Sequence, residues 1–263
     1  MKLTFYKYQG TGNDFVIIDN RELVLSKNDT KLFSRLCDRK FGIGADGLML
    51  LEVSEYPEDD FKMVYFNADG NESSMCGNGG RCLVAFASHM GVIQNTAVFT
   101  AIDGKHYAEI EGDTVCLQMQ NVEEIQHYDS HLFLDTGSPH HVTQVKDLPN
   151  YDVVNKGRAI RNGAPYFEKG SNVNFVEAKA ENEFAVRTYE RGVEDETLSC
   201  GTGVTAVALS MDALGVSNGE ETTIHTPGGV LKVRFKKENK LYKDIFLIGS
   251  AKQVFKGEID VNA

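Results

Sequence analysis

Residues 74–81 read Ser-Met-Cys-Gly-Asn-Gly-Gly-Arg and residues 198–205 read Leu-Ser-Cys-Gly-Thr-Gly-Val-Thr, so a cysteine-glycine turn recurs after 124 residues. The same offset aligns the flanking residues without a gap, because Tyr65 falls on Tyr189 and Gly104 falls on Gly228. Self-similarity at a fixed offset indicates a duplicated structural unit. The sequence therefore predicts two related halves, and we expect the function to lie where the two cysteine turns meet.

Each turn opens a run of small and apolar residues, at 82–90 in the first half and at 204–214 in the second. A helix that is apolar on nearly every face is buried all round. The fold class expected is α/β (α+β): two pseudo-symmetric domains from an internal duplication, each a mixed or antiparallel sheet wrapped around a central helix. Only the N-terminal end of each helix would then be open to a ligand, which places the active site in the cleft between the domains.

Cys76 and Cys200 occupy these two helix starts. A helix N-terminus offers unpaired backbone N–H groups and a partial positive charge, which bind anions and favour a thiolate over a thiol. A helix-end contribution of about 1 kcal/mol raises the thiolate fraction at pH 7 only from about 3% to roughly 15%. Two thiols that face one ligand titrate as a coupled pair, so the expected resting state is one thiolate and one thiol. Such a pair supplies a base and an acid.

The composition limits the class of ligand. The chain has 263 residues, 41% of them hydrophobic, and a formal net charge of -11 without any run of Lys and Arg. Such a charge argues against nucleic acid or an anionic membrane as partner and favours a small-molecule substrate. We also expect a soluble, cytoplasmic protein, because no export signal precedes Phe5 and no apolar run approaches 18 residues.

The odd count of five cysteines argues against a disulfide framework in such a chain, and the Cys and His spacings match no structural zinc site. We therefore expect no metal and no cofactor, and we expect Cys37 and Cys116 to lie in the core. The glycine-rich loop at 41–47 lacks the Gly-Lys-Ser/Thr of a phosphate-binding loop and opens a strand, which argues against a nucleotide site.

Three further polar sites each allow a structural and a functional interpretation. Asn13 and Asp14 stand in a glycine-flanked turn, where they could simply cap their own backbone. His140 follows Ser-Pro in a loop and could be a structural donor, and Glu190-Arg191 could be a solvated strand end. The repeat favours function for Arg191, since it falls on Asn67 at a strand end that faces the predicted cleft.

Five motifs together resemble the diaminopimelate epimerase family, and the resemblance extends from the first strand to the last glycine loop. These are Asn13-Asp14-Phe15, Phe66-Asn67-Ala68-Asp69-Gly70, Met75-Cys76-Gly77-Asn78-Gly79, Tyr189-Glu190-Arg191-Gly192 and Cys200-Gly201-Thr202-Gly203. The resemblance implies a pyridoxal-independent isomerase that converts LL- to meso-diaminopimelate in lysine and cell-wall biosynthesis. It also implies a homodimer, and domains at 1–119 with a returning strand 252–263, and at 120–251.

The resemblance implies a role for each matching residue. Cys76 and Cys200 are similar to the catalytic base and acid, although the sequence leaves open which is which. Support for the thiols is implied for His140 and Glu190. Substrate binding is implied for Asn13, Asn67, Gly77, Asn78, Asn172, Glu190, Arg191, Gly201 and Thr202.

Two positions depart from the family pattern: Ser138 stands where the best-known members have Asn, and Gly47 where some have Gln. Recognition of the far end of the substrate is therefore less well defined than the inversion chemistry. A related racemase of another amino acid is the alternative within the enzymes. Proline racemases carry His where this chain has Asn78. A thiol-disulfide switch would explain paired cysteines but not paired anion-binding helix ends.

Overall fold

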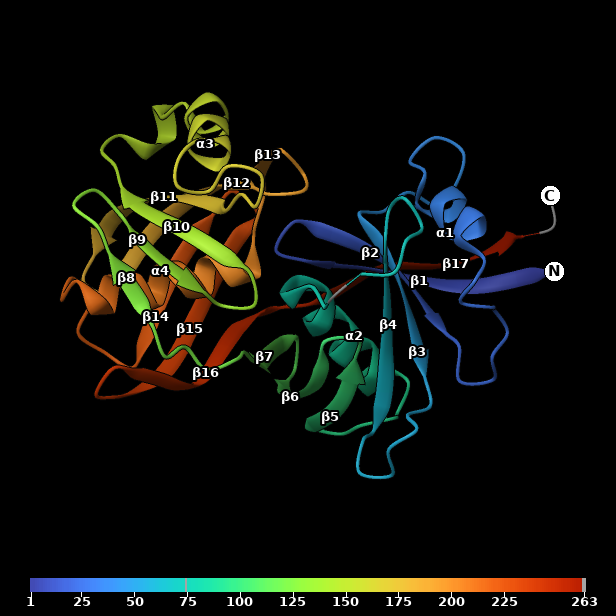
Figure 1. Ribbon diagram of the computed structural model, residues 1–263. Coiled ribbons are helices and arrows are strands. Elements are labelled where there is room, and N and C mark those ends of the chain that lie inside the picture. The colour runs from blue at the N-terminus through green and yellow to red at the C-terminus, as the bar shows by residue number, and fades with distance from the viewer. Residues whose placement is uncertain (74, 262–263) are drawn as a thin grey trace. The chain divides into compact units, whose positions relative to one another are not determined.

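The computed structural model describes residues 1–73 and 75–261. Ser74 of the first cysteine turn and the last two residues of the predicted strand 252–263 lie outside this part. The chain forms two compact units, Met1–Leu117 with the segment that begins at Gly249, and Gln118–Ile248. These units lie close to the predicted domains 1–119 with 252–263 and 120–251, whose limits stay a prediction. The fold is a mixed α+β fold, dominated by sheet and duplicated, as the sequence predicts (Figure 1).

The first unit wraps its strands around helix α2 and carries a second, shorter helix, α1. Its helices are α1 (Thr30–Cys37) and α2 (Gly77–His89). Its strands are β1 (Lys2–Gly10), β2 (Asn13–Asp19), β3 (Gly47–Glu52), β4 (Phe61–Asn67), β5 (Thr96–Ala101), β6 (Gly104–Glu111), β7 (Thr114–Gln118) and the returning β17 (Lys252–Asp260).

The second unit repeats this plan around helix α4. Its helices are α3 (Val153–Asn162), α4 (Gly201–Ala213) and the short 3-10 helix η1 (Leu148–Asn150). Its strands are β8 (Ile125–His127), β9 (Leu132–Asp135), β10 (Pro139–Gln144), β11 (Asn172–Ala180), β12 (Glu183–Glu190), β13 (Asp195–Thr197), β14 (Glu221–Thr226), β15 (Gly229–Glu238) and β16 (Leu241–Ser250).

Strand directions show the duplication independently of the sequence. From β1 to β6, neighbouring strands pair antiparallel, parallel, antiparallel, parallel and antiparallel in turn. From β9 through β12 and β14 to β15, the same five directions follow in the same order. Two polar turns therefore have equivalent places, one where β1 passes into β2 and the other where β9 passes into β10.

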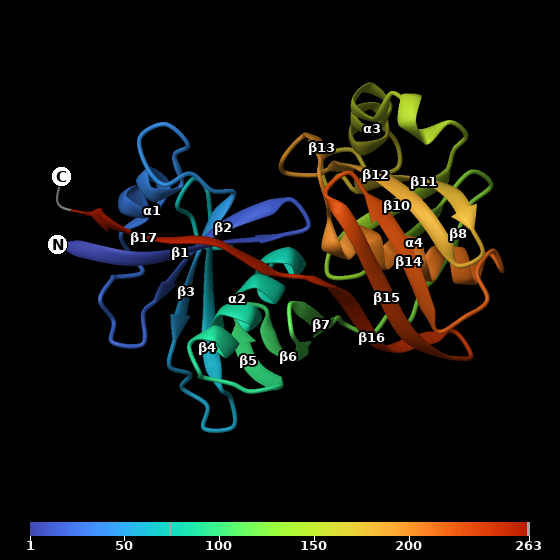
Figure 2. The same ribbon diagram turned by 180° about the vertical axis from the view of Figure 1, so that it is seen from behind.

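The two central helices correspond residue for residue. Both begin directly after a cysteine, and their first and last residues are 124 positions apart, as in the sequence repeat. Each is followed by a C-cap in the right-handed helical region and then by a glycine, Gly91 at φ 70° and Gly215 at φ 69°. Side chains with a Cβ rarely adopt such a φ, which explains why both helices end at glycine. Figure 2 shows α2 and α4 each among the strands of its own unit.

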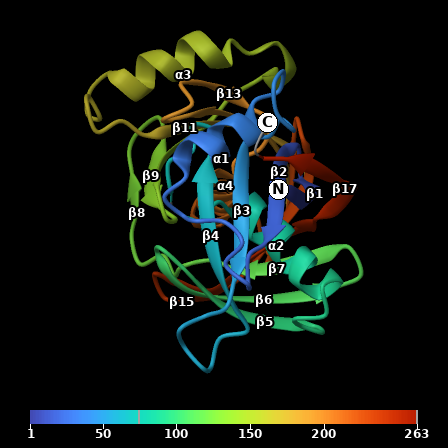
Figure 3. The ribbon, with the colours of Figure 1, turned by 90° about the vertical axis from the view of Figure 1, so that its right-hand side faces the viewer.

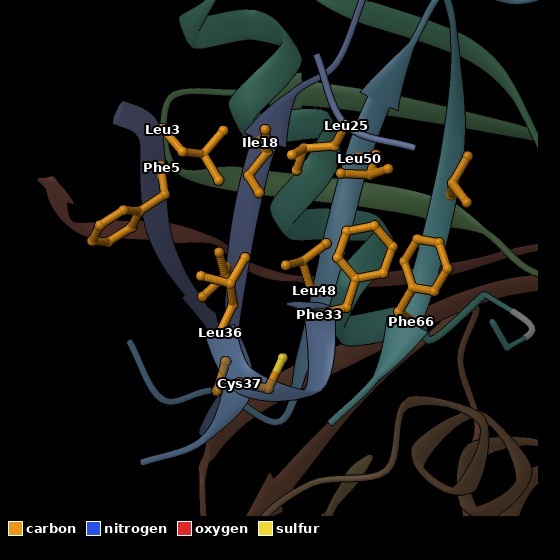
Figure 4. Packing of buried hydrophobic residues seen from close by; sticks show 13 residues of the cluster. Leu3, Phe5, Ile18, Leu25, Phe33, Leu36, Cys37, Leu48, Leu50 and Phe66 are labelled. Carbon is orange, nitrogen blue, oxygen red and sulfur yellow. The ribbon is translucent and has the colours of Figure 1, made fainter. Parts of the chain in front are cut away.

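A hydrophobic cluster anchors α1 on the outer face of the first sheet (Figure 4). The rings of Phe33 and Phe66 lie 4.4 Å apart, and both are buried. Cys37 at the end of α1 is 3% exposed, which confirms that it is a core residue. This packing holds the loop that follows α1 against the start of β3, where polar residues of the first unit gather.

The returning strand β17 completes the first unit by pairing antiparallel with β1, from Lys2 opposite Asp260 to Gln9 opposite Lys252 (Figure 3). The described residues of the predicted strand thus pair with the first unit.

Cys116 was expected in the core, but it is only half-buried. Its neighbours Val115 and Leu117 on β7 are buried, and successive side chains of a strand point to opposite faces. Helix α3 was not predicted, because its polar sequence has few apolar positions.

Candidate active site

Cys76 and Cys200 are the N-cap residues of α2 and α4, with extended backbones at φ -93° and -119°. Their carbonyls accept the first helical hydrogen bonds, from Gly80 N–H at 2.7 Å and from Val204 N–H at 2.9 Å. Neither side chain caps its own helix. Both residues are thiols, and Cys76 is half-buried while Cys200 is 9% exposed. The N–H groups of each first helical turn therefore point past a cysteine side chain.

In the first unit, Asn13 and Asn78 form a direct contact between the start of β2 and the start of α2. The Asn78 amide donates to Asn13 Oδ1 at 2.6 Å, and the Asn13 amide donates to Asp46 Oδ2 at 3.1 Å. Asn78 is fully buried, and Asn13 is half-buried. The structure thus brings together two of the predicted substrate-binding residues and fixes which way their amide groups point.

A charged cluster just outside these asparagines holds Asp46 in place. Arg39 Nη2 lies 2.7 Å from Asp46 Oδ1 and 2.6 Å from Asp14 Oδ1, and Lys7 Nζ lies 2.6 Å from Asp14 Oδ2. Burial opposes ionisation of Asp14, but hydrogen bonds and charge from Arg39 and Lys7 lower its pKa to about 2. The Asp14 carboxylate therefore stays ionised at neutral pH and accepts the backbone N–H of Asp46 at 3.2 Å.

Asn67 ends β4 opposite Gly47 on β3, and its residue is exposed. Gly47 stands there because nothing larger fits: an added Cβ would lie 2.5 Å from Tyr65 Cε2 and 2.8 Å from the Tyr65 hydroxyl. Contacts this close do not occur without displacement of the neighbour. In this chain the ring of Tyr65 therefore fills the space beside Asn67 that a longer side chain at position 47 would need.

In the second unit, a chain of hydrogen bonds leads from Asn174 to Cys200. Asn174 Nδ2 lies 3.1 Å from His140 Nδ1, and His140 Nε2 lies 3.0 Å from Ser138 Oγ. Ser138 Oγ lies 3.3 Å from Thr202 Oγ1, which lies 3.4 Å from Cys200 Sγ. His140 and Asn174 are fully buried. The imidazole thus reaches the thiol through two hydroxyl groups.

The donors and acceptors in this series of hydrogen bonds follow from the chemistry of its side chains. Asn174 can only donate from Nδ2, so His140 accepts at Nδ1 and carries its proton on Nε2. Ser138 Oγ accepts from His140 and also from Asn172 Nδ2 at 3.1 Å, which leaves its own proton for Thr202. Burial, and then the charge of Arg191, lower the pKa of His140 to about 3, so the ring is neutral. The Thr202 hydroxyl therefore donates to the sulfur.

Asn172, Glu190 and Arg191 meet at the ends of β11 and β12. Asn172 Oδ1 accepts the backbone N–H of Arg191 at 2.9 Å, while Glu190 Oε2 accepts from Thr197 Oγ1 at 2.9 Å. The Arg191 guanidinium donates to the carbonyl of Lys169 at 3.0 Å, and this residue is exposed. Among the described residues its other N–H groups have no protein acceptor, the arrangement that binding of a carboxylate requires.

The predicted residues thus form one group within each unit. The first holds Asn13, Gly77, Asn78 and Cys76, with Asn67 at the neighbouring strand end, and the second holds His140, Asn172, Glu190, Arg191, Cys200, Gly201 and Thr202. Sequence reasoning missed Asp46, Arg39 and Asn174, which orient the asparagines and the histidine. Only the Asp46 position gave a signal, an acidic residue in a glycine-rich loop before a buried strand.

The described residues contain neither a candidate metal site nor a membrane-spanning helix. No group of three or more His, Cys, Asp and Glu side chains in that part is placed to hold a metal ion. Within the same residues, no helix has the length and apolar character needed to span a membrane.

The architecture recurs in solved structures of distant sequence. A phenazine biosynthesis protein of the PhzF family from Bacillus anthracis is 13% identical, with a TM-score of 0.75, and the match covers 99% of each chain. A hydroxyproline epimerase from Agrobacterium vitis is 12% identical, with a TM-score of 0.69, over 98% of this chain and 92% of that one. The chain thus shares its fold with these two proteins, one of which is an amino-acid epimerase.

Sequence comparison narrows the class. The model of the family described as diaminopimelate epimerase matches residues 5–124 and 132–254, one segment for each half. A diaminopimelate epimerase from Flavobacterium psychrophilum is 56% identical over 98% of this chain and 100% of its own length. One from Aquifex aeolicus is 39% identical over 98% of both chains. This chain belongs to the diaminopimelate epimerase family, and it is an amino-acid epimerase.

Proposed function

We propose that this chain interconverts LL- and meso-diaminopimelate with Cys76 and Cys200 as its acid and base. The observation that carries the proposal is the matched position of the two thiols, each at the N-cap of a central helix, in a chain of this family. No cofactor is needed in this scheme, since proton removal and return are both assigned to side chains of the protein.

The first step is removal of the α-proton by a thiolate. The α-carboxylate binds the N–H groups of the first helical turns, those of Gly77 and Asn78 on one side and of Gly201 and Thr202 on the other. These dipoles stabilise the negative charge that spreads into the carboxylate as the carbanion forms. Because the N–H groups are fixed by the helices, they require no reorganisation when that charge develops.

The second step is return of a proton to the opposite face. A carbanion next to a carboxylate is planar, so inversion requires an acid on the side away from the base. We propose that the two units close on the substrate with one thiol on each face. When Cys200 has given up its proton, the Thr202 hydroxyl at 3.4 Å stabilises the thiolate by donating to it. In the reverse reaction the two thiols exchange roles.

His140 supports Cys200 indirectly in this scheme. Its proton lies on Nε2 and is directed at Ser138, so it orients the two hydroxyls rather than removing a proton itself. We assign a supporting role to Glu190 as well, because its carboxylate lies at the end of β12 beside Thr197 and accepts from that hydroxyl. An amine on the substrate would give Glu190 a further donor.

Recognition of the rest of the substrate is assigned to Asn13, Asn67, Asn172, Glu190 and Arg191. Asn13 and Asn172 lie at the ends of equivalent strand pairs and have fixed amide orientations. Arg191 is the cation of this group, and a planar guanidinium holds a carboxylate through two parallel hydrogen bonds. A substrate with an amino-acid group at both ends matches these donors and acceptors.

A related racemase of another amino acid is the second candidate. The fold it shares with a hydroxyproline epimerase favours it, since similar scaffolds act on different substrates. The exposed Arg191 favours a substrate with a second carboxylate, which proline derivatives lack. The two candidates therefore differ in the far end of the substrate and agree in the inversion chemistry.

The deciding experiment is to incubate the purified protein with LL-diaminopimelate in deuterium oxide, without pyridoxal phosphate or metal. We expect deuterium at the α-carbon and formation of the meso isomer. The variants Cys76→Ser and Cys200→Ser should lose epimerisation, whereas Cys116→Ser, on the half-buried face of β7, should retain it. Exchange with glutamate or hydroxyproline but not with diaminopimelate would overturn the substrate assignment and leave the mechanism standing.

The remaining assignments follow from the family rather than from the site. We propose that the product serves lysine and cell-wall biosynthesis, that the protein works in the cytoplasm and that it forms a homodimer. Light scattering of the purified chain tests the last point, since a particle of the monomer mass of 29.1 kDa at micromolar concentration would contradict it.

A further inference from the structure

Arg81 is a fully buried arginine in the second turn of α2. Its side chain folds back toward the helix start, where Nη1 donates to the carbonyl of Gly77 at 3.2 Å. Nη2 donates to Thr11 Oγ1 and to Asn78 Oδ1, both at 2.9 Å. Every one of these acceptors is neutral. The guanidinium therefore lies beside the residue that follows Cys76, with hydrogen bonds but no counter-charge among them.

In the described part of the chain no carboxylate accepts from Arg81, and its Nε finds no acceptor there. An isolated buried charge costs several kcal/mol unless an opposite charge compensates it. Arginine does not escape this cost by losing its proton, because its pKa in water lies above 12. A buried anion near the start of α2 would provide the missing compensation.

The groups around Arg81 leave one candidate for that anion. Burial raises the pKa of Cys82, its neighbour on α2, and of Tyr8 on β1 to about 12, so both stay neutral. Asp103 lies between β5 and β6, where it accepts from Met75 N–H at 3.5 Å and pairs with His106 at 3.3 Å. Strands β2 and β3 present the apolar Phe15 and Met49 to the first turn of α2, at Gly79. Cys76 remains, because it directly precedes Gly77, whose carbonyl accepts from the Arg81 guanidinium.

The second half of the duplicated chain has no cation at the position equivalent to Arg81. Thr205 occupies the position equivalent to Arg81, and its hydroxyl donates to the carbonyl of Gly201 at 3.0 Å. Cys200 receives a neutral hydroxyl from Thr202 instead. Since a full charge stabilises a thiolate more than a neutral donor does, the two thiols of the pair are not equivalent in the free protein.

We propose that Arg81 is a positioning residue that holds Cys76 as the thiolate and leaves the proton of the resting pair on Cys200. Cys76 is then the base for the substrate that binds to the free enzyme, and Cys200 is the acid that returns a proton. After one turnover the proton lies on Cys76, and solvent exchange restores the resting state. The catalytic consequence rests on the proposed two-thiol mechanism, but the charge state of the free protein does not.

The test is alkylation of the substrate-free protein by iodoacetamide at a series of pH values, with each cysteine followed separately by peptide mass spectrometry. Only a thiolate reacts, so the rate at each cysteine reports its ionisation. In the wild type we expect Cys76 to reach half its maximal rate at least one pH unit below Cys200. In Arg81→Met the midpoint of Cys76 should rise by about 1 to 3 pH units, the range for loss of a neighbouring opposite charge.

Matched variants separate charge from packing. Arg81→Lys retains the cation and should keep most of the low midpoint, and Thr205→Val, at the equivalent position of the second half, should leave the Cys76 midpoint unchanged. An Arg81→Met protein with an unaltered Cys76 midpoint would overturn the proposal. So would a wild type in which Cys200 titrates first, a result that stands even if the methionine variant does not fold. Because no substrate is present, failure of the diaminopimelate assay leaves this result unaffected.

Discussion

Replacing Gly203 with alanine tests how tightly the start of α4 is packed. An added Cβ would lie 2.5 Å from Asn174 Oδ1 and 3.4 Å from Cys200 Sγ. Asn174 cannot move freely, because its amide donates to His140 and to the His141 carbonyl while its Oδ1 accepts from Thr188 at 2.9 Å. Relief of the clash therefore breaks buried hydrogen bonds.

The magnitude follows from those bonds. Loss of two buried hydrogen bonds at about 1 to 3 kcal/mol each outweighs the gain of up to about 1 kcal/mol from replacing glycine in a helix. We expect Gly203→Ala to lower the free energy of unfolding by about 3 kcal/mol in urea titrations. A displaced Cys200 sulfur should lower kcat/KM by about 100-fold, as expected for misplacement of a reacting group.

Gly79 occupies the equivalent position in the first half and provides the control. Its added Cβ would lie 3.3 Å from Met49 Sδ and 3.5 Å from the ring of Phe15. The flexible methionine can shift, so Gly79→Ala should change the stability by no more than about 1 kcal/mol. Equal damage from both variants, or a Gly203→Ala protein as stable and active as the wild type, would refute this reasoning.

Four further predictions concern the second unit. Ser138→Ala leaves the His140 Nε2–H without its acceptor, so stability should fall by about 1 to 3 kcal/mol in urea titrations and kcat should fall more than KM rises. Ser210→Ala removes a buried hydroxyl that has no hydrogen-bond partner in the described chain. This substitution should leave the free energy of unfolding unchanged. Burial, together with the charge of His131, lowers the pKa of His141 to about 3, so the unfolded chain binds a proton that the folded chain does not as pH falls below about 6.5. The free energy of unfolding should therefore drop by about 2 kcal/mol per such histidine between pH 7 and pH 5, and His141→Asn should reduce that slope. Arg191→Ala should lower kcat/KM for diaminopimelate by about 30- to 900-fold, corresponding to about 2 to 4 kcal/mol, and an unchanged value would show that the guanidinium is only a surface group.

The repeat made the fold predictable. Two cysteine-glycine turns at one offset located α2 and α4, and the apolar runs behind them indicated burial on all sides, which the structure confirms. Alternating runs located most strands because their turns carry glycine, as at Gly104 and Gly112, both with positive φ. Helix α3 was not predicted, because a polar helix that buries only Val153 and Gly157 has little hydrophobic periodicity in its sequence.

The groups that orient the candidate site could not be read from the sequence, because they act across long separations. Asp46 reaches Asn13 over 33 residues, and Asn174 reaches His140 over 34. Arg81 stood in the decisive stretch itself, yet a lone arginine near a helix start reads as a surface residue. In the structure Arg81 is instead fully buried, and its acceptors among the described residues are all neutral. Such relations depend on tertiary packing, whereas the cysteine turns are local.

The place of β17 on β1 affects how the chain is made. Residues 118–248 are contiguous and can fold as they leave the ribosome, but the first unit lacks its partner for β1 until these have been translated. At about 5 to 20 residues per second, this interval lasts roughly 7 to 26 seconds. During that time β1 presents an unpaired edge, the kind of surface to which other nascent chains add. The period of greatest aggregation risk thus comes early in synthesis, and it ends only when the last strand emerges.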